Sequence, residues 1–155
     1  MSPLSLATLR SSLGRVAREI SRVLGRSLAG ELRVRLAADD EVARAHERYL
    51  DVPGTTDVIT FDLTEGGSAS GEPIDADLLL CVDEARRQAE RRAISLEREL
   101  LLYATHGLLH CLGEDDHDPA GHDRMHAFED RLLESIGVGA TFSHGAAPRG
   151  TPMEN

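Results

Sequence analysis

No uninterrupted apolar segment of this 155-residue chain exceeds five residues, and one segment of that length is LLLCV, at residues 78–82. Five apolar residues are far too few for a membrane-spanning helix, which needs about 20. A short run without alternating polar residues is typical of a strand that is buried on both faces. We therefore predict a strand over residues 74–82 at the centre of a sheet, in a protein that does not cross a membrane.

Two further strands and five helices are predicted around this segment. Residues 31–36 alternate apolar with charged side chains, and residues 56–63 are rich in β-branched and aromatic residues. Apolar spacings of three and four residues predict helices over 6–23, from 39 or 40 to before Pro53, over 83–92 and 96–112, and from 119 to 136. The predicted caps at the starts of the last four helices are Asp39 or Asp40, Asp83, Ser95 and Asp118. Because strands and helices do not alternate regularly, we expect an α+β fold, with a small mixed sheet covered by helices.

The length of the chain is that of one domain. We expect this domain to span residues 1–137, where the periodic apolar positions end. Residues 138–155 are rich in Gly, Ala, Pro and Ser, a composition that predicts a disordered tail. Cys81 and Cys111 lie in apolar or helical patterns and are interpreted as buried thiols. The first residues lack the pattern of a secretory signal, so we expect a cytoplasmic protein.

Five of the seven histidines fall between residues 106 and 126. His106 and His110 are four residues apart on a predicted helix, so their rings project from one face and can share a metal ion. Gly113 permits a sharp turn, after which the segment EDDHD, at residues 114–118, can bring a third ligand back to the same ion. Such a shell leaves a position open for water, as catalytic zinc sites do. We predict one Zn²⁺ per chain, although other divalent transition ions suit the same ligands.

The residue after the first histidine argues against one class of metal enzyme. HExxH peptidases have their general base there, whereas this chain has Gly107. A zinc peptidase or amidase remains an alternative that needs its base from elsewhere. Because Gly107 has no side chain beyond a hydrogen atom, it is interpreted as leaving room beside the metal site for a large substrate. His122 and His126, also four apart, are interpreted as solvated or as supporting the metal ligands.

The segment HGLLHCLGEDDH, at residues 106–117, resembles the HGxLHLxGYDH signature of the YbeY family. These are bacterial rRNA maturation factors described as metal-dependent endoribonucleases specific for single strands. YLDVPGTTDVITFDL is similar to the family's TDVLSF segment, and IDADLLLCVDEARRQA is similar to its GDIxIs strand and following helix. The resemblance covers about residues 31–137. It implies an α+β fold with a metal site on a helix over a sheet, and a role in maturing the 3′ end of 16S rRNA.

Three positions depart from the family pattern. The third ligand of the family aligns with Asp116, with His117 one residue later, so both stay candidates. Leu50 stands where the family has an Arg after the Tyr, so that presumed phosphate contact is not carried over. Ala76 replaces the Gly of the strand motif, while its Asp is retained as Asp77.

The resemblance implies phosphodiester cleavage in which a metal polarises a phosphoryl oxygen and activates water or the 2′-OH. The member of the Asp116 and His117 pair that does not bind the metal, or alternatively Glu114, is the candidate general base. Thr56 and Asp57 are candidates to orient the site from the strand, or else they close the turn. A non-catalytic ribosome-assembly factor with a structural metal is a further alternative.

All 17 basic residues are Arg, and the net charge is −10. Residues 1–50 carry nine Arg against six acids, whereas the rest carry eight against twenty-one. RNA binding needs a local cationic surface, and the best candidates are Arg15, Arg18, Arg22, Arg26, Arg86 and Arg87, unless these are simply solvated helix faces. We expect weak, salt-sensitive binding of single-stranded rRNA precursor through its backbone, with a small ribosomal subunit or ribosomal protein as partner and no DNA.

Overall fold

The predicted central strand, β3 (Ile74–Cys81), lies between the other two strands of a small mixed sheet. β1 (Gly30–Ala37) pairs with it in parallel, and β2 (Val58–Asp62) pairs with it antiparallel. Successive side chains of a strand point to opposite faces, and β3 is buried on both: Leu78 and Leu80 face the main core, while Leu79 and Cys81 face a smaller one. This computed structural model describes residues 4–67, 70–114 and 117–143.

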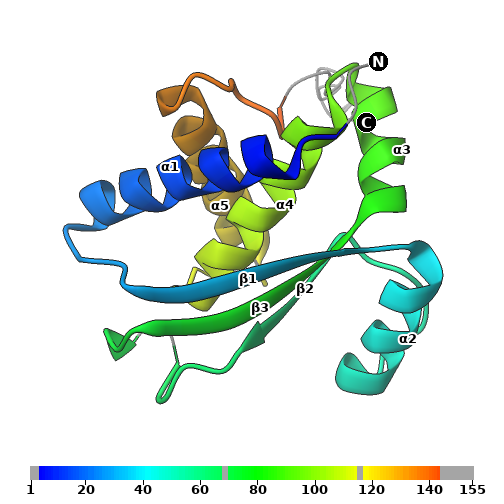
Figure 1. The fold of residues 1–155 in the computed structure, drawn as a ribbon, viewed down its shortest axis with the longest axis horizontal. Coiled ribbons are helices and arrows are strands. Elements are labelled where there is room, and N and C mark those ends of the chain that lie inside the picture. The colour runs from blue at the N-terminus through cyan, green and yellow to red at the C-terminus, as the bar shows by residue number, and fades with distance from the viewer. Residues whose placement is uncertain (1–3, 68–69, 115–116, 144–155) are drawn as a thin grey trace, which may run out of the picture.

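The helices of the described residues cover both faces of the sheet unequally (Figure 1). They are α1 (Leu6–Leu24), α2 (Asp39–Leu50), α3 (Val82–Arg92), α4 (Leu96–Cys111) and α5 (Pro119–Ser135). The layer of α1, α4 and α5 encloses the main core, and α2 covers the smaller core on the opposite face. The expected α+β class with a small mixed sheet is confirmed. No helix among the described residues has the length and apolarity to span a membrane.

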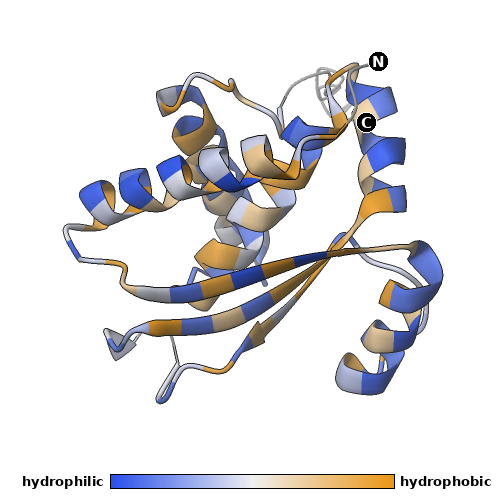
Figure 2. Ribbon diagram, viewed as in Figure 1, coloured by the Kyte–Doolittle hydropathy of each residue, from blue (hydrophilic) through white to orange (hydrophobic). Residues whose placement is uncertain are grey.

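α4 is the central helix of the molecule and contacts α1, α3, α5, β2 and β3. Ser95 begins it as predicted, its hydroxyl accepting the backbone N–H of Arg98 at 3.2 Å. Figure 2 shows apolar residues on α4 and the sheet, in contrast to the hydrophilic outer sides of α1 and α3. Because α4 is enclosed on almost every side, the side chains it carries are held in fixed positions.

Gly107 brings α4 close to the sheet. A Cβ at this position would lie 2.8 Å from Leu78 Cδ2 and 3.2 Å from Thr60 Oγ1. The interpretation of Gly107 as room for a substrate is therefore wrong, because its missing side chain faces β2 and β3 and not a cavity.

The start of α2 is stabilised from α3. Ala38 precedes α2 without a side-chain cap, and the backbone N–H of Asp39 donates to Asp83 Oδ2 at 2.8 Å. Asp83, predicted to cap its own helix, thus caps its neighbour. Both carboxylate oxygens of Asp39 in turn accept from Arg87 at 2.8 Å. Bonds from Arg87 and from the Cys81 thiol hold the pKa of Asp39 well below its usual range.

The chain keeps specific contacts after α5. Thr141 is fully buried, and its hydroxyl accepts from Arg98 Nε at 2.8 Å. Asp130 Oδ1 accepts the backbone N–H groups of Thr141 and Phe142 at 2.9 and 2.8 Å. Residues 138–143 are therefore ordered, in contrast to the disordered tail that we predicted to begin at Val138. The composition does not reveal their order, because it depends on a few polar contacts and one aromatic ring. Residues 144–155 lie outside the described residues, and for them the tail stays a prediction.

Candidate metal centre

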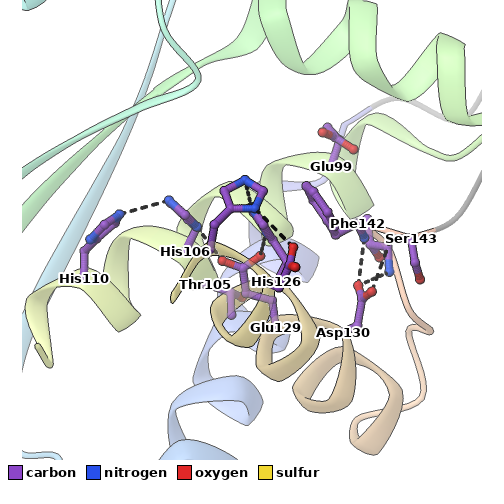
Figure 3. A network of polar contacts seen from close by, with 12 residues as sticks. Glu99, Thr105, His106, His110, His126, Glu129, Asp130, Phe142 and Ser143 are labelled. Atoms are coloured by element: carbon purple, nitrogen blue, oxygen red, sulfur yellow. Dashed lines mark hydrogen bonds and ion pairs between the residues drawn. The ribbon is translucent and has the colours of Figure 1, made fainter. Parts of the chain in front are cut away.

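The two histidines of the HxxxH motif lie side by side on α4, with His106 Nε2 and His110 Nε2 3.0 Å apart (Figure 3). Their rings meet edge to face at a centroid distance of 4.6 Å. Two nitrogens bound to one tetrahedral zinc ion at about 2.0–2.1 Å would lie about 3.3 Å apart. The pair therefore has nearly the separation that a shared ion requires.

Glu129 of α5 orients one of these rings. Its side chain is fully buried, and Oε1 accepts from His106 Nδ1. The other carboxylate oxygen accepts from His126 Nδ1 at 2.7 Å. Burial alone raises the pKa of a carboxyl group, but the hydrogen bonds from the two rings bring the pKa of Glu129 below its usual value. An ionised Glu129 fixes the proton of His106 on Nδ1 and leaves Nε2 as a metal ligand.

His106, His126 and Glu129 form another group that could hold a metal ion. Each residue offers one ligand atom, and the three atoms lie within 4.8 Å of one another. The contacts of Glu129 with the rings, however, are as short as hydrogen bonds, and shorter than the roughly 3.3 Å between two ligands of one zinc ion. We interpret Glu129 as the acceptor that positions the rings, and the Nε2 side of His106 as the side that suits a metal.

His126 is packed directly behind His106. The two rings are stacked at a centroid distance of 5.6 Å, and Phe142 stacks on His126 at 3.5 Å. Arg92 lies over the Phe142 ring, 5.4 Å from its centroid. The last described residues thus complete the environment of the candidate site.

A cavity of about 400 Å³ opens beside His106. Its walls come from the segment before β2 and from α3, α4 and α5, and include Thr56, Asp57, Gln88 and Tyr103. Asp57 Oδ1 accepts the Val58 backbone N–H at 2.7 Å and the Thr56 hydroxyl at 3.3 Å. The two residues predicted to orient the site therefore lie in the same cavity as the first histidine of the motif.

A buried ion pair and a tyrosine also line this cavity. Arg92 donates to both oxygens of Glu99, at 2.8 and 2.9 Å, and Glu99 is fully buried. Burial raises the pKa of Glu99 despite the opposing effect of Arg92. Tyr103 is 4% exposed, and its hydroxyl has no hydrogen-bond partner among the described residues. Burial and the neighbouring carboxylates, Glu99 foremost, raise the pKa of Tyr103 well above its usual range.

The other predicted residues of the motif lie after α4. Glu114 is half-buried, and its backbone N–H donates to the carbonyl of Leu109 at 3.1 Å. His117 is exposed and is not part of the close three-residue group found among the described residues. Asp116 lies outside the described residues. The choice between Asp116 and His117 as third ligand therefore stays open.

Five of the six predicted RNA-binding arginines lie on α1 and α3, and Arg26 lies just after α1. Most of the six have partners in the chain. Arg15 donates to the carbonyl of Ile136 at 2.6 Å, and Arg22 pairs with Glu19. Arg86 forms an ion pair with Asp83 on its own helix. Arg87 forms ion pairs with Glu84 on its own helix and with Asp39 on α2. Their role towards RNA stays a prediction.

Known proteins match both the sequence and the fold. The family model described as Endoribonuclease YbeY matches residues 3–137. Endoribonuclease YbeY of Salinibacter ruber is 40% identical over 105 residues, 65% of this chain and 67% of the relative. That of Thermobifida fusca is 37% identical over 126 residues, 78% of this chain and 81% of the relative. The solution structure of TM1509 from Thermotoga maritima covers 97% of this chain and 96% of its own, with a TM-score of 0.56 at 19% identity, which supports the fold.

Proposed function

Because the chain belongs to the endoribonuclease YbeY family, we propose that it is a metal-dependent enzyme that cleaves single-stranded RNA. The observation that carries the metal dependence is the His106 and His110 pair, whose Nε2 atoms face each other at 3.0 Å while the buried Glu129 accepts from His106 Nδ1. We propose Zn²⁺ as the ion, since two imidazoles with a further histidine or carboxylate suit it.

In this proposal His106 and His110 hold the ion, with Asp116 or His117 as third ligand. The ion supplies Lewis acidity towards the phosphodiester group. Glu129 keeps the proton of His106 on Nδ1, so that Nε2 stays available. Thr56 and Asp57 line the cavity next to His106 and orient the substrate. The general base is Glu114 or whichever of Asp116 and His117 is not a ligand.

The substrate we propose is an rRNA precursor, cut near the 3′ end of 16S rRNA in the cytoplasm. A chain with a net charge of −10 repels RNA at long range. Binding then depends on local arginines and weakens steeply with salt. A ribosomal protein or the small subunit is proposed to supply the missing positive charge.

The test is cleavage of a labelled single-stranded RNA by the full chain, with a duplex of the same sequence for comparison. We expect cleavage of the single strand, loss of activity with a chelator, and recovery with Zn²⁺. His110→Ala should reduce the rate at least about 100-fold, because a bound metal supplies several kcal/mol of transition-state stabilisation. His46→Ala is the matched control, since His46 lies on α2 and contacts the carbonyl of Gly54.

Two results would overturn the proposal. Hydrolysis of peptides or amides without cleavage of RNA would favour a zinc peptidase or amidase. Unfolding of His110→Ala, together with a folded, metal-loaded wild type that does not cut RNA, would favour a structural metal in a non-catalytic assembly factor.

A further inference from the structure

We propose that His122 and His126 on α5 form a second transition-metal site, next to the one proposed on α4. The two histidines are four residues apart, so their rings project from the same face of the helix. His126 Nε2 and His122 Nε2 lie 3.1 Å apart, and the rings meet edge to face at 4.3 Å. The arrangement repeats that of His106 and His110, where the same atoms are 3.0 Å apart.

Carboxylates lie on the Nδ1 side of both rings of this second pair. His126 Nδ1 is 2.7 Å from Glu129 Oε2, and His122 Nδ1 is 3.7 Å from Asp123 Oδ1. The hydrogen bond to Glu129 favours the tautomer of His126 that has its lone pair on Nε2, whereas 3.7 Å is too long for a hydrogen bond from His122 to Asp123. The lone pair of His126 Nε2 faces His122 Nε2, where either a proton of that ring or a metal ion bound by both nitrogens satisfies it.

One ligand of this pair is held in place and the other is accessible. The side chain of His126 is 14% exposed and is fixed between Glu129 and the stacked ring of Phe142. The side chain of His122 is 47% exposed and faces solvent. A site with one rigid and one surface ligand keeps coordination positions open for water.

The second pair forms a site of its own, separate from the first. The rings of His106 and His126 are stacked with their Nδ1 atoms on the two oxygens of Glu129, and each Nε2 faces a partner on its own helix. Glu129 therefore supports one ligand of each pair. The ligand chemistry selects a borderline ion such as Zn²⁺, Ni²⁺ or Cu²⁺, because Mg²⁺ and Ca²⁺ prefer oxygen ligands.

The number of ions bound per chain tests the proposal. Metal-free full-length protein is titrated with Zn²⁺ against a chromophoric chelator, and the bound metal is counted by mass spectrometry. We expect two ions for the wild type, one for His122→Ala, one for His110→Ala and two for the control His46→Ala. The substitution at His122 is on an exposed side chain, and circular dichroism checks that the variant is folded.

Nuclear magnetic resonance of the imidazole nitrogens identifies the ligands independently of activity. In His110→Ala, which lacks the first pair, Zn²⁺ should shift the ring signals of His122 and His126 and leave those of His46 unchanged. A wild type that binds one ion, a His122→Ala variant that still binds two, an equal loss in His46→Ala, or ring signals that do not move would each overturn the second site. Because His110→Ala isolates the second pair, this outcome is separate from failure of the proposed nuclease activity.

Discussion

The buried carboxylate of Glu129 on α5 accepts from His106 Nδ1 on α4, so one helix fixes the ring orientation of a proposed metal ligand on another. Glu129→Gln replaces one acceptor oxygen by an NH₂ donor, which cannot accept from a ring N–H. We expect the affinity for Zn²⁺ to fall about 10- to 100-fold, as for other partners of metal-binding histidines.

Competition with a chelator measures this affinity, and Glu134→Gln is the control, since Glu134 is an exposed residue of the same helix. An unchanged affinity in a folded Glu129→Gln variant would show that Glu129 does not position His106.

Two glycines on helices should respond oppositely to alanine. At Gly107 the new Cβ would meet Leu78 at 2.8 Å, so Gly107→Ala should destabilise the protein by about 1–3 kcal/mol. At Gly14 on α1 the nearest atom is a flexible Arg18 nitrogen at 3.7 Å, so Gly14→Ala should stabilise it by about 0.5–1 kcal/mol. Denaturant unfolding of both variants checks the pair. Stabilisation by both substitutions would mean that α4 does not pack this closely on the sheet.

The sequence predicts the fold well where the pattern is local. The apolar run of β3 identifies a strand buried on both faces, and Ser95 is the observed start of α4. The interpretation of Gly107 as substrate space is wrong because the role of this residue depends on Leu78, which lies on a strand far away in the sequence. The prediction that Asp83 caps its own helix is wrong for the same reason, since Asp83 caps α2 by accepting the backbone N–H of Asp39. Contacts between distant segments carry no periodic signal along the chain.

The end of the folded domain can be tested by truncation. A chain ending at Gly137 loses the buried Thr141 and the contacts of Arg98 with residues 140 and 141. We expect it to be destabilised by about 2 kcal/mol or more, from lost hydrogen bonds and apolar burial. A chain ending at Ser143 keeps these contacts and should match the full chain in thermal unfolding. Equal stability of all three chains would place the domain boundary at residue 137.

Asp39 should make stability depend on acid pH. Its pKa is lowered in the folded state by Arg87 and then Cys81, so the folded chain holds its proton less tightly than the unfolded chain. The stabilisation is present above the unfolded value of about 4 and is lost as the pH falls below it. Asp39→Asn should be less stable at pH 7 and lose less stability between about pH 5 and pH 2.

Denaturant midpoints across this range measure the effect. The adjacent Asp40 makes a longer contact with Arg44, 3.4 Å, on the surface, and Asp40→Asn is the control. The same pH dependence in wild type and Asp39→Asn would contradict the role of the Asp39 and Arg87 pair.

The sequence predicts the histidine pair of the candidate site but not the residues that surround it. The spacing of His106 and His110 predicts that their rings meet, and they do. Glu129 is not predicted, although a signal exists: an acidic residue occupies a buried position of α5, one turn after Met125. Phe142 gives no such signal, because it is a single aromatic ring in a segment of small residues, and only the tertiary fold stacks it on His126.

The location of a bound ion tests the central claim most directly. A crystal of the zinc-loaded full chain, measured at the zinc absorption edge, should show an anomalous peak about 2.1 Å from the Nε2 atoms of both His106 and His110. Glu129 should remain hydrogen-bonded to His106 Nδ1 in that crystal. A peak on the Nδ1 side of His106, bound directly by Glu129, or no peak near the two Nε2 atoms, would contradict the metal centre proposed for this chain.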